Sequence, residues 1–141
     1  VGAEIGLGPL IDAARRDGWS VAWPRVRGNG PLGFHLATAP ELAPGHRGIP
    51  EPSQTAPLVR PDVLLVPLVA ADRSGNRLGQ GGGHYDRTLA EARSHGPVLA
   101  IGVGWDMQIL PALAAAAWDQ PLDAIATPTG FHPVSRRDRE G

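Results

Sequence analysis

Cysteine and lysine are both absent from this sequence of 141 residues. Without cysteine the chain has no disulfides, thiolate metal sites or thiol nucleophiles. All 13 basic residues are arginine, so a cationic side chain that contacts phosphate must be a planar guanidinium. No apolar run could span a bilayer and no signal peptide opens the sequence, so we expect a soluble cytoplasmic protein without membrane contacts.

Strong net charge is also missing, because 13 basic residues face 14 acidic ones and the formal net charge is -1. A near-neutral chain offers no general surface for nucleic acid, so we expect a small-molecule substrate. The length suits one domain, which we place at residues 1–134, followed by a loose charged tail at 135–141. We expect a monomer.

The pattern of apolar and turn residues predicts the elements of an α/β fold. In the first half it predicts a helix over 9–16 ended by Gly18, a strand over 19–23 stopped by Pro24, and a further strand near 34–38 within a largely ordered loop at 25–61. In the second half it predicts a strand at 63–66 buried on both faces, a helix at 83–95, a strand at 97–103, a helix at 111–117 and a strand at 122–127. This order favours a mainly parallel sheet built from βαβ units.

The most informative segment is 77–87, Arg-Leu-Gly-Gln-Gly-Gly-Gly-His-Tyr-Asp-Arg, with four glycines in five positions. Glycines allow backbone N–H groups to approach one anion, and the helix that follows would add the positive end of its dipole. The spacing matches neither a Walker A motif nor a dinucleotide fingerprint. A flexible connection is an equally good explanation of an isolated glycine cluster, although its place after a candidate central strand favours a ligand site.

The side chains around the loop each have two interpretations. Asp86 is either a favourable charge at a helix N-terminus or a magnesium ligand beside bound phosphates. Arg77 and Arg87 are either solvated charges or phosphate contacts, with Arg77 the better candidate of the two. Tyr85 falls on the apolar stripe of the helix with Leu89 and Ala92, and is core if it is not part of a site.

Residues 61–87, from Pro-Asp-Val-Leu-Leu-Val-Pro to the glycine-rich segment, closely resemble the signature of the 5-formyltetrahydrofolate cyclo-ligase family, also called methenyltetrahydrofolate synthetases. Further segments resemble the family in the same order: Glu4-Ile5, the Trp-Pro-Arg-Val at 23–26, the Gly-Ile-Pro-Glu-Pro at 48–52, the Trp-Asp-Met-Gln at 105–108 and the stretch 119–123. The resemblance covers residues 1–128.

The resemblance implies a three-layer α/β/α fold of the CoA-transferase-like type with a mainly parallel central sheet. It also implies the ATP- and Mg²⁺-dependent conversion of 5-formyltetrahydrofolate to 5,10-methenyltetrahydrofolate, with release of ADP and phosphate. Phosphoryl transfer depends on positioning and charge neutralisation more than on a covalent nucleophile, so the lack of cysteine is no objection.

The resemblance also assigns site residues. The ATP phosphates would be held by Arg77, Leu78, Gly79, Gln80, Gly81, Gly82, Gly83, His84 and Tyr85, and the catalytic groups would be Arg77, Tyr85 and Asp86. Asp86 and Asp119 would bind magnesium, and Glu4 and Glu51 would contact the folate. Taken alone, Glu4, Glu51 and Asp119 are better explained as surface acids, because lone acidic residues mostly lie on the surface. Gln108 is interpreted as lining or support.

The sequence also departs from the family pattern. His84 stands where a tyrosine is usual, Ala71 replaces a phenylalanine, and small residues within 112–117 lengthen the segment before Asp119. Family members carry roughly fifty more N-terminal residues, with cations that reach ATP, so we expect this chain to be a truncated or mis-started form. The alternative function is therefore a catalytically weak nucleotide- or folate-binding module; a third is a plain α/β domain acting through protein contacts.

Overall fold

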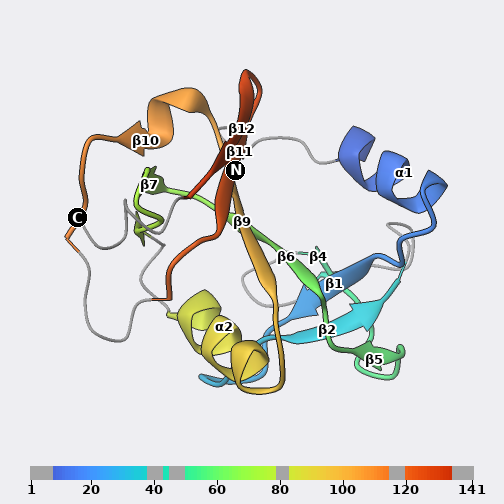
Figure 1. Ribbon diagram of the computed structural model, residues 1–141. Helices are drawn as coiled ribbons and strands as arrows, with labels where there is room; N and C mark the ends of the chain where they lie inside the picture. Colours follow the sequence, from blue (N-terminus) through green and yellow to red (C-terminus); the bar gives the residue numbers. More distant parts are fainter. Residues whose placement is uncertain (1–7, 38–42, 45–49, 79–82, 115–119, 135–141) are drawn as a thin grey trace. The chain divides into compact units, whose positions relative to one another are not determined.

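The computed structural model describes residues 8–37, 43–44, 50–78, 83–114 and 120–134. The chain divides into two compact units, one of residues Gly6–Pro61 and the other of Val1–Ile5 with Asp62–Gly141 (Figure 1). Each contains short strands and one described α-helix, and the second unit also has a 3-10 helix (Asp106–Gln108), so the fold is α/β with mixed sheets and few helices. In the described part of the chain no helix has the length and apolarity to cross a membrane.

The unit of residues 6–61 is built on a small antiparallel sheet. Helix α1 (Gly8–Arg16) comes first, as the sequence predicts, and Gly18 follows it with a φ of 91°. Strands β1 (Ala22–Arg25), β2 (Gly33–Leu36) and β5 (Leu58–Val59) form a sheet in the order β1-β2-β5, and β3 (Ala43–Pro44) pairs with β4 (Pro50–Glu51). Arg15 Nη2 and Trp23 Nε1 both donate to Ala37 O, at 3.0 and 2.9 Å, and so fasten α1 and β1 beyond the end of β2.

The prediction of a strand over 19–23 that Pro24 stops is wrong. The strand instead runs over Ala22–Arg25, with Pro24 inside it opposite Phe34. Proline has no N–H to donate, and sheets tolerate it where that edge is not needed for pairing. Because β1 is the edge strand of its sheet and pairs on one side only, a proline is tolerated within it.

The second unit is organised around a four-stranded sheet in the order β12-β11-β9-β6. Strands β6 (Val63–Pro67), β9 (Leu99–Val103) and β11 (Ala124–Thr127) are parallel neighbours, and β12 (Gly130–Pro133) pairs antiparallel with β11. The predictions at 63–66, 97–103 and 122–127 are confirmed apart from their ends. The burial of β6 is one-sided, since Leu64 and Val66 are buried while Val63 and Leu65 are half-buried.

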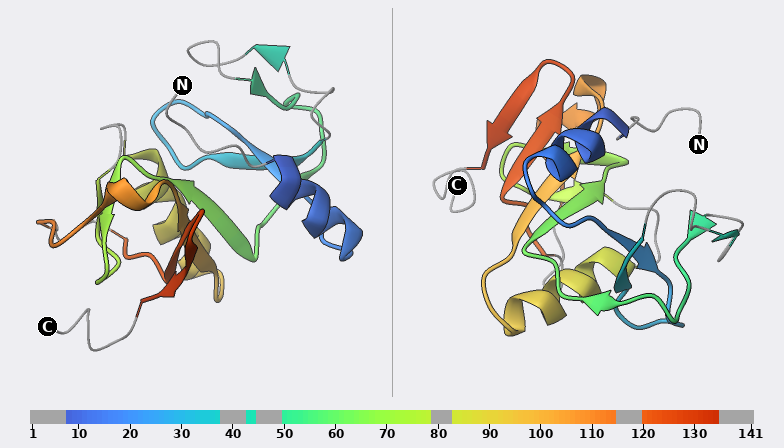
Figure 2. Two further views of the ribbon diagram at one scale, coloured as in Figure 1. Left: turned by 90° about the horizontal axis from the view of Figure 1, so that it is seen from above. Right: turned by 90° about the vertical axis from the view of Figure 1, so that its right-hand side faces the viewer.

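Helix α2 (His84–Ser94) confirms the helix predicted over 83–95. It lies beside β9 in each view, and its N-terminus points toward the segment that precedes β11 (Figures 1 and 2). Leu89 is fully buried, whereas Tyr85 and Ala92 on the same stripe are half-buried. The apolar stripe therefore packs inward mainly through its central residue.

A second sheet of this unit has the order β10-β7-β8, and its strands β7 and β8 follow β6 in the sequence. It consists of β7 (Ala70–Asp72), β8 (Arg77–Leu78) and β10 (Ile109–Leu110). The helix predicted over 111–117 is wrong for its described residues, 111–114, which are irregular. Leu113 N donates to Asp72 Oδ2 at 2.8 Å and so ties this irregular stretch to β7.

The α/β class is thus confirmed, and the three-layer arrangement with a mainly parallel central sheet stays a prediction. The expected tail at 135–141 and residues 115–117 lie outside the described residues.

Candidate functional site

A buried carboxylate organises the turn that leads to Arg77. Asp72 Oδ1 accepts from Ser74 N and Asn76 N, both at 3.0 Å, while Oδ2 accepts from Asn76 Nδ2 at 3.0 Å and from Leu113 N at 2.8 Å. Asp72 is 3% exposed, so these bonds are shielded from water. The β7–β8 turn is therefore fixed in shape, and Arg77 is the first residue after it.

The same turn is also tied to the segment before β11. Gly75 has a φ of 90°, and Leu122 N donates to Gly75 O at 2.8 Å. A Cβ on Gly75 would lie 2.6 Å from Leu122 O, so only glycine allows the two backbones to come this close.

On the other side of the glycine-rich segment, Gly83 turns the chain into α2. Its φ of 69° lies in the left-handed region, which favours glycine. A Cβ at this position would lie 2.7 Å from Arg87 Nη1, so the Arg87 guanidinium folds back over the start of the helix. Of the predicted phosphate-binding segment, Gly79, Gln80, Gly81 and Gly82 lie outside the described residues, and Leu78 is exposed.

Arg77, Tyr85 and Asp86, the three predicted catalytic residues, lie together. Arg77 Nη2 is 3.5 Å from Asp86 Oδ1, and the guanidinium lies 5.7 Å from the centre of the Tyr85 ring. The Arg77 side chain is only 6% exposed, against 22% for Asp86. Arg77 Nε is buried and has no hydrogen-bond partner in the described part of the chain. A buried guanidinium with unused donor capacity is suited to an anionic ligand.

Asp86 also contacts the chain that follows Asp119. Gln120 N donates to Asp86 Oδ1 at 3.0 Å. Asp119 itself, the second predicted magnesium ligand, lies outside the described residues, as does Glu4. The carboxylate of Asp86 thus has one arginine and one backbone N–H as its described partners.

Glu51 is buried in the unit of residues 6–61. Its Oε2 accepts from Val26 N at 2.7 Å, and its Oε1 lies 3.9 Å from Arg25 Nη1. Arg25 Nη1 also donates to Pro52 O at 3.0 Å. The carboxylate therefore joins β4 to the end of β1, a role the sequence did not predict.

Two further side chains hold loops in place. Gln108 Nε2 donates to Leu68 O at 2.9 Å and Val69 O at 3.2 Å, and its Oε1 accepts from Trp105 N at 2.7 Å, which confirms a supporting role. Asp106 accepts hydrogen bonds from the hydroxyls of Thr127 and Thr129 at 2.6 and 2.5 Å. These two hydrogen bonds lower the pKa of Asp106 below its ordinary value of 3.8, and the bond from Thr127 has the larger effect.

Sequence reasoning missed Arg93 and gave Asp72 no role. Arg93 lies in the last turn of α2 and binds residues 120, 121 and 123. A basic residue at a helix C-terminus is the expected partner of the helix dipole, so nothing in the sequence marks its distant partners. For Asp72 the signal was present, since an acid followed by Ser, Gly and Asn predicts a side-chain-capped turn.

Comparison with known proteins identifies the family. The model of the 5-formyltetrahydrofolate cyclo-ligase family matches residues 1–128. The 5-formyltetrahydrofolate cyclo-ligase of Escherichia coli K12 is 38% identical over 134 residues, which cover 89% of this chain and 72% of that protein. The chain belongs to the 5-formyltetrahydrofolate cyclo-ligase family. The cyclo-ligase of Mycolicibacterium smegmatis is 35% identical over 126 residues, 89% of this chain and 62% of that protein.

Solved structures agree with the family membership. The NMR structure of the Aquifex aeolicus 5,10-methenyltetrahydrofolate synthetase superposes with a TM-score of 0.76 at 31% identity, over 95% of this chain and 68% of that one. The synthetase from Mycoplasma pneumoniae, at 22% identity and a TM-score of 0.65 over 89% of this chain and 66% of that one, supports the fold alone. Within the family signature at residues 61–87, the structure brings Arg77, Tyr85 and Asp86 together in one cluster.

Proposed function

We propose that this chain catalyses the ATP-dependent cyclisation of 5-formyltetrahydrofolate to 5,10-methenyltetrahydrofolate, a ligase reaction of one-carbon metabolism. The formyl oxygen attacks the γ-phosphorus of ATP, and the bond from phosphorus to the bridging oxygen breaks to release ADP. N10 then bonds to the activated formyl carbon and loses its proton to water, while the carbon–oxygen bond breaks and phosphate leaves.

The main support for this proposal is the buried Arg77 guanidinium, which lies directly before the glycine-rich segment in the sequence. Its Nε has no hydrogen-bond partner among the described residues. In phosphoryl transfer the negative charge spreads over the oxygens of the transferred group, so fixed positive groups lower the barrier. Arg77 supplies one such charge. The N-terminus of α2, which starts directly after Gly83, adds backbone N–H groups and the positive end of a helix dipole.

Tyr85 would keep the arginine in place. Its ring lies 5.7 Å below the guanidinium, a contact that favours the charged group without using its hydrogen-bond donors. The arginine can therefore donate to phosphate while it rests on the ring.

Asp86 fits a magnesium ion that arrives with ATP. Mg²⁺ in nucleotide sites is bound through one or two carboxylates together with phosphate oxygens and water. Within residues 8–37, 43–44, 50–78, 83–114 and 120–134 no group of three or more His, Asp and Glu side chains could hold a metal ion. Asp86, with Asp119, would thus provide the carboxylates, and the nucleotide would provide further oxygens. A bound Mg²⁺ neutralises phosphate charge and orients the γ-phosphate.

The finer assignments belong to the same proposal. Glu51 and Glu4 would contact the folate, and the rigid hold of Val26 and Arg25 on Glu51 would fix its carboxylate for that purpose. The protein would be a cytoplasmic monomer with a three-layer α/β/α core around a mainly parallel sheet, acting on a small molecule and not on nucleic acid.

The test is an absorbance assay for methenyltetrahydrofolate with purified protein, ATP, Mg²⁺ and 5-formyltetrahydrofolate. Wild type should form product, and Asp86→Ala should lower kcat by at least about 100-fold, the usual cost of losing a charge-stabilising group. Arg60→Gln removes an exposed arginine of the other unit and should change neither kcat nor KM.

A wild-type protein that binds ATP without forming product would favour the alternative, a weak binding module. Full turnover by Asp86→Ala would remove Asp86 from the site.

A further inference from the structure

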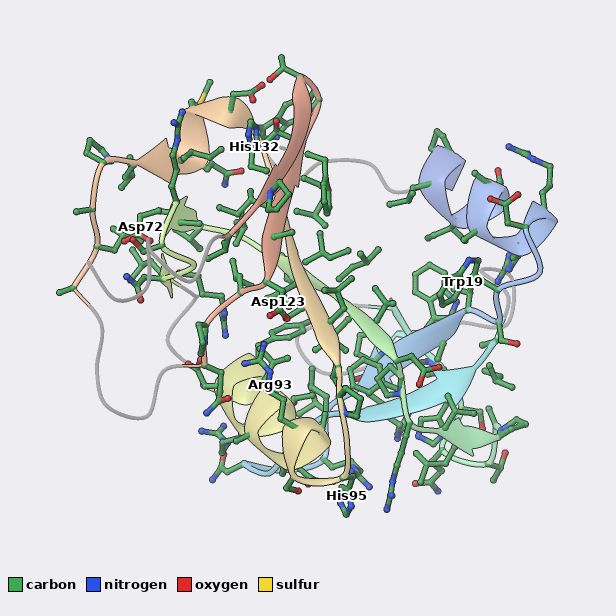
Figure 3. All side chains as sticks on the ribbon, viewed as in Figure 1. Trp19, Asp72, Arg93, His95, Asp123 and His132 are labelled. Atoms are coloured by element: carbon green, nitrogen blue, oxygen red, sulfur yellow. The ribbon has the colours of Figure 1, made fainter. Side chains whose placement is uncertain are left out.

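A single guanidinium on α2 holds three points of the segment before β11. We call residues 120–123 the strap. Arg93 Nη1 donates to Gln120 Oε1 at 3.2 Å, and Nη2 donates to Pro121 O at 2.8 Å and to Asp123 Oδ2 at 3.1 Å. Figure 3 shows Arg93 reaching from α2 toward Asp123. The planar fork of arginine serves several acceptors in fixed directions, so the strap is held in one position along the helix.

The end of the strap has further anchors that do not involve Arg93. Leu122 N donates to Gly75 O at 2.8 Å, and Asp123 N donates to Ala100 O at 2.8 Å. Asp123 Oδ2 accepts in return from Ala100 N at 2.8 Å. Residues 122 and 123 should therefore stay in place without the Arg93 guanidinium.

The start of the strap depends on Arg93. Among the described residues, Gln120 has hydrogen bonds only to Arg93, through Oε1, and to Asp86, whose Oδ1 accepts from Gln120 N at 3.0 Å. Asp86 and Arg93 are seven residues apart and so lie on one face of a helix with 3.6 residues per turn. Arg93 thus fixes Gln120 over the same helix face that carries Asp86.

The Gln120 N–H binds the carboxylate oxygen that faces Arg77. Arg77 Nη2 lies 3.5 Å from Asp86 Oδ1, whereas a charge-assisted hydrogen bond joins nitrogen and oxygen at about 2.7–2.9 Å. The ion pair is therefore open. Opposite charges that are shielded from water attract each other strongly, and the bond from Gln120 N holds the carboxylate against that attraction.

We infer that Arg93 is a positioning residue for Arg77: through Gln120 it holds Asp86 back from a closed ion pair and leaves the Arg77 guanidinium available to phosphate. This inference rests on the proposed function, in which Arg77 is a phosphate contact. Without Arg93 the Asp86 carboxylate closes on Arg77, and a nucleotide must break that pair before it can bind. Arg93 acts through the strap and contacts neither nucleotide nor folate.

The experiment compares wild type, Arg93→Gln, Asp86→Asn and the double variant in calorimetric titrations with a non-hydrolysable ATP analogue in EDTA, so that no metal ion contributes. Arg93→Gln should bind about tenfold more weakly than wild type, which corresponds to the loss of one hydrogen bond to a charged group. Asp86→Asn keeps an oxygen for Gln120 N and removes the charge that closes on Arg77. The double variant should therefore bind within about twofold of Asp86→Asn alone, a clear departure from additivity.

The rescue by Asp86→Asn separates positioning from a general loss of stability. A double variant that binds as weakly as Arg93→Gln overturns the inference, because removal of one charge cannot repair a site that has lost its fold. Unchanged binding in a folded Arg93→Gln protein overturns it as well.

A milder variant and a matched control complete the set. Gln120→Ala removes only the acceptor at the start of the strap, so it should weaken analogue binding in the same direction; if Arg93→Gln does not fold, unchanged binding in Gln120→Ala overturns the inference. Glu91→Gln changes an exposed charge on the same helix and should bind as wild type. In turnover assays Arg93→Gln should raise the KM for ATP and leave the KM for 5-formyltetrahydrofolate unchanged.

The positioning role and the activity can fail separately. A wild type that forms product, beside an Arg93→Gln protein that binds the analogue equally well, overturns the inference alone. A wild type that binds the analogue without forming product overturns the activity, and weak binding by Arg93→Gln that Asp86→Asn restores would still support the inference. A wild type that binds no analogue in EDTA overturns the inference whatever its turnover, because Arg77 is then not available to phosphate.

Discussion

Asp72→Asn tests whether the β7–β8 turn owes its shape to the buried carboxylate. The change keeps the size of the side chain and replaces one of its two oxygens by an NH₂ group. Asp72 accepts two hydrogen bonds on each oxygen, so either orientation of the amide loses one acceptor atom with its two hydrogen bonds and points the N–H groups at other donors.

The magnitude follows from the burial of the site. Hydrogen bonds to a charged group contribute about 1.5–3 kcal/mol each, so two lost bonds should lower the free energy of unfolding by at least about 3 kcal/mol. At roughly 3 °C per kcal/mol for a chain of this size, the melting temperature should fall by at least about 9 °C. Asp72→Ala removes all four bonds and should cost more.

The assay is thermal and urea unfolding followed by tryptophan fluorescence, together with the KM for ATP. Because the turn leads directly into Arg77, the KM for ATP should rise several-fold in Asp72→Asn at a temperature where the variant is folded. Asp62→Asn, an exposed position of the same unit, should stay within about 0.5 kcal/mol of wild type. An Asp72→Asn protein as stable as wild type would refute the reasoning.

Two further predictions concern other carboxylates. Glu51→Gln can still accept from Val26 N but loses its charge attraction to Arg25, so stability should fall by about 1 kcal/mol. The KM for 5-formyltetrahydrofolate should rise at least tenfold, and an unchanged KM would leave Glu51 a purely structural residue. Thr127→Val removes the largest cause of the lowered pKa of Asp106, so NMR titration should find that pKa closer to 3.8. Because the folded-state pKa is lowered, the stabilisation from these hydroxyls is present above pH 3.8 and is lost as the pH falls through the lowered value. A pKa of Asp106 that does not move would contradict the assignment.

The elements that the sequence predicted well are those whose pattern is local. Helix α2 has an apolar stripe and a glycine at its start, and β6 and β9 are short apolar runs, so neighbouring residues carry enough information. The family signature then placed Arg77, Tyr85 and Asp86 in one site, and the structure brings these three together.

The features that the sequence did not predict depend on contacts between distant residues. Pro24 looks like the end of a strand until the edge position of β1 is known. The bond that ties the stretch after β10 to β7 joins Leu113 and Asp72, 41 residues apart. The hydrogen-bond partners of Arg93 lie 27 to 30 residues further along the chain. No local pattern encodes such pairs, because they exist only after the chain has folded.

The ion pair with Asp86 explains how the buried Arg77 guanidinium can be stable in the absence of a ligand. A charged side chain that is only 6% exposed would be costly without a partner, and Asp86, with its oxygen 3.5 Å away, reduces that cost. Under the proposed function, Arg77 would pair with phosphate and Asp86 with the metal ion when the nucleotide binds. Each charge would then exchange one partner for another. The Asp72 carboxylate fixes the turn before Arg77, and Gln120 N donates to Asp86, so each partner of the pair is held in place by a different part of the chain.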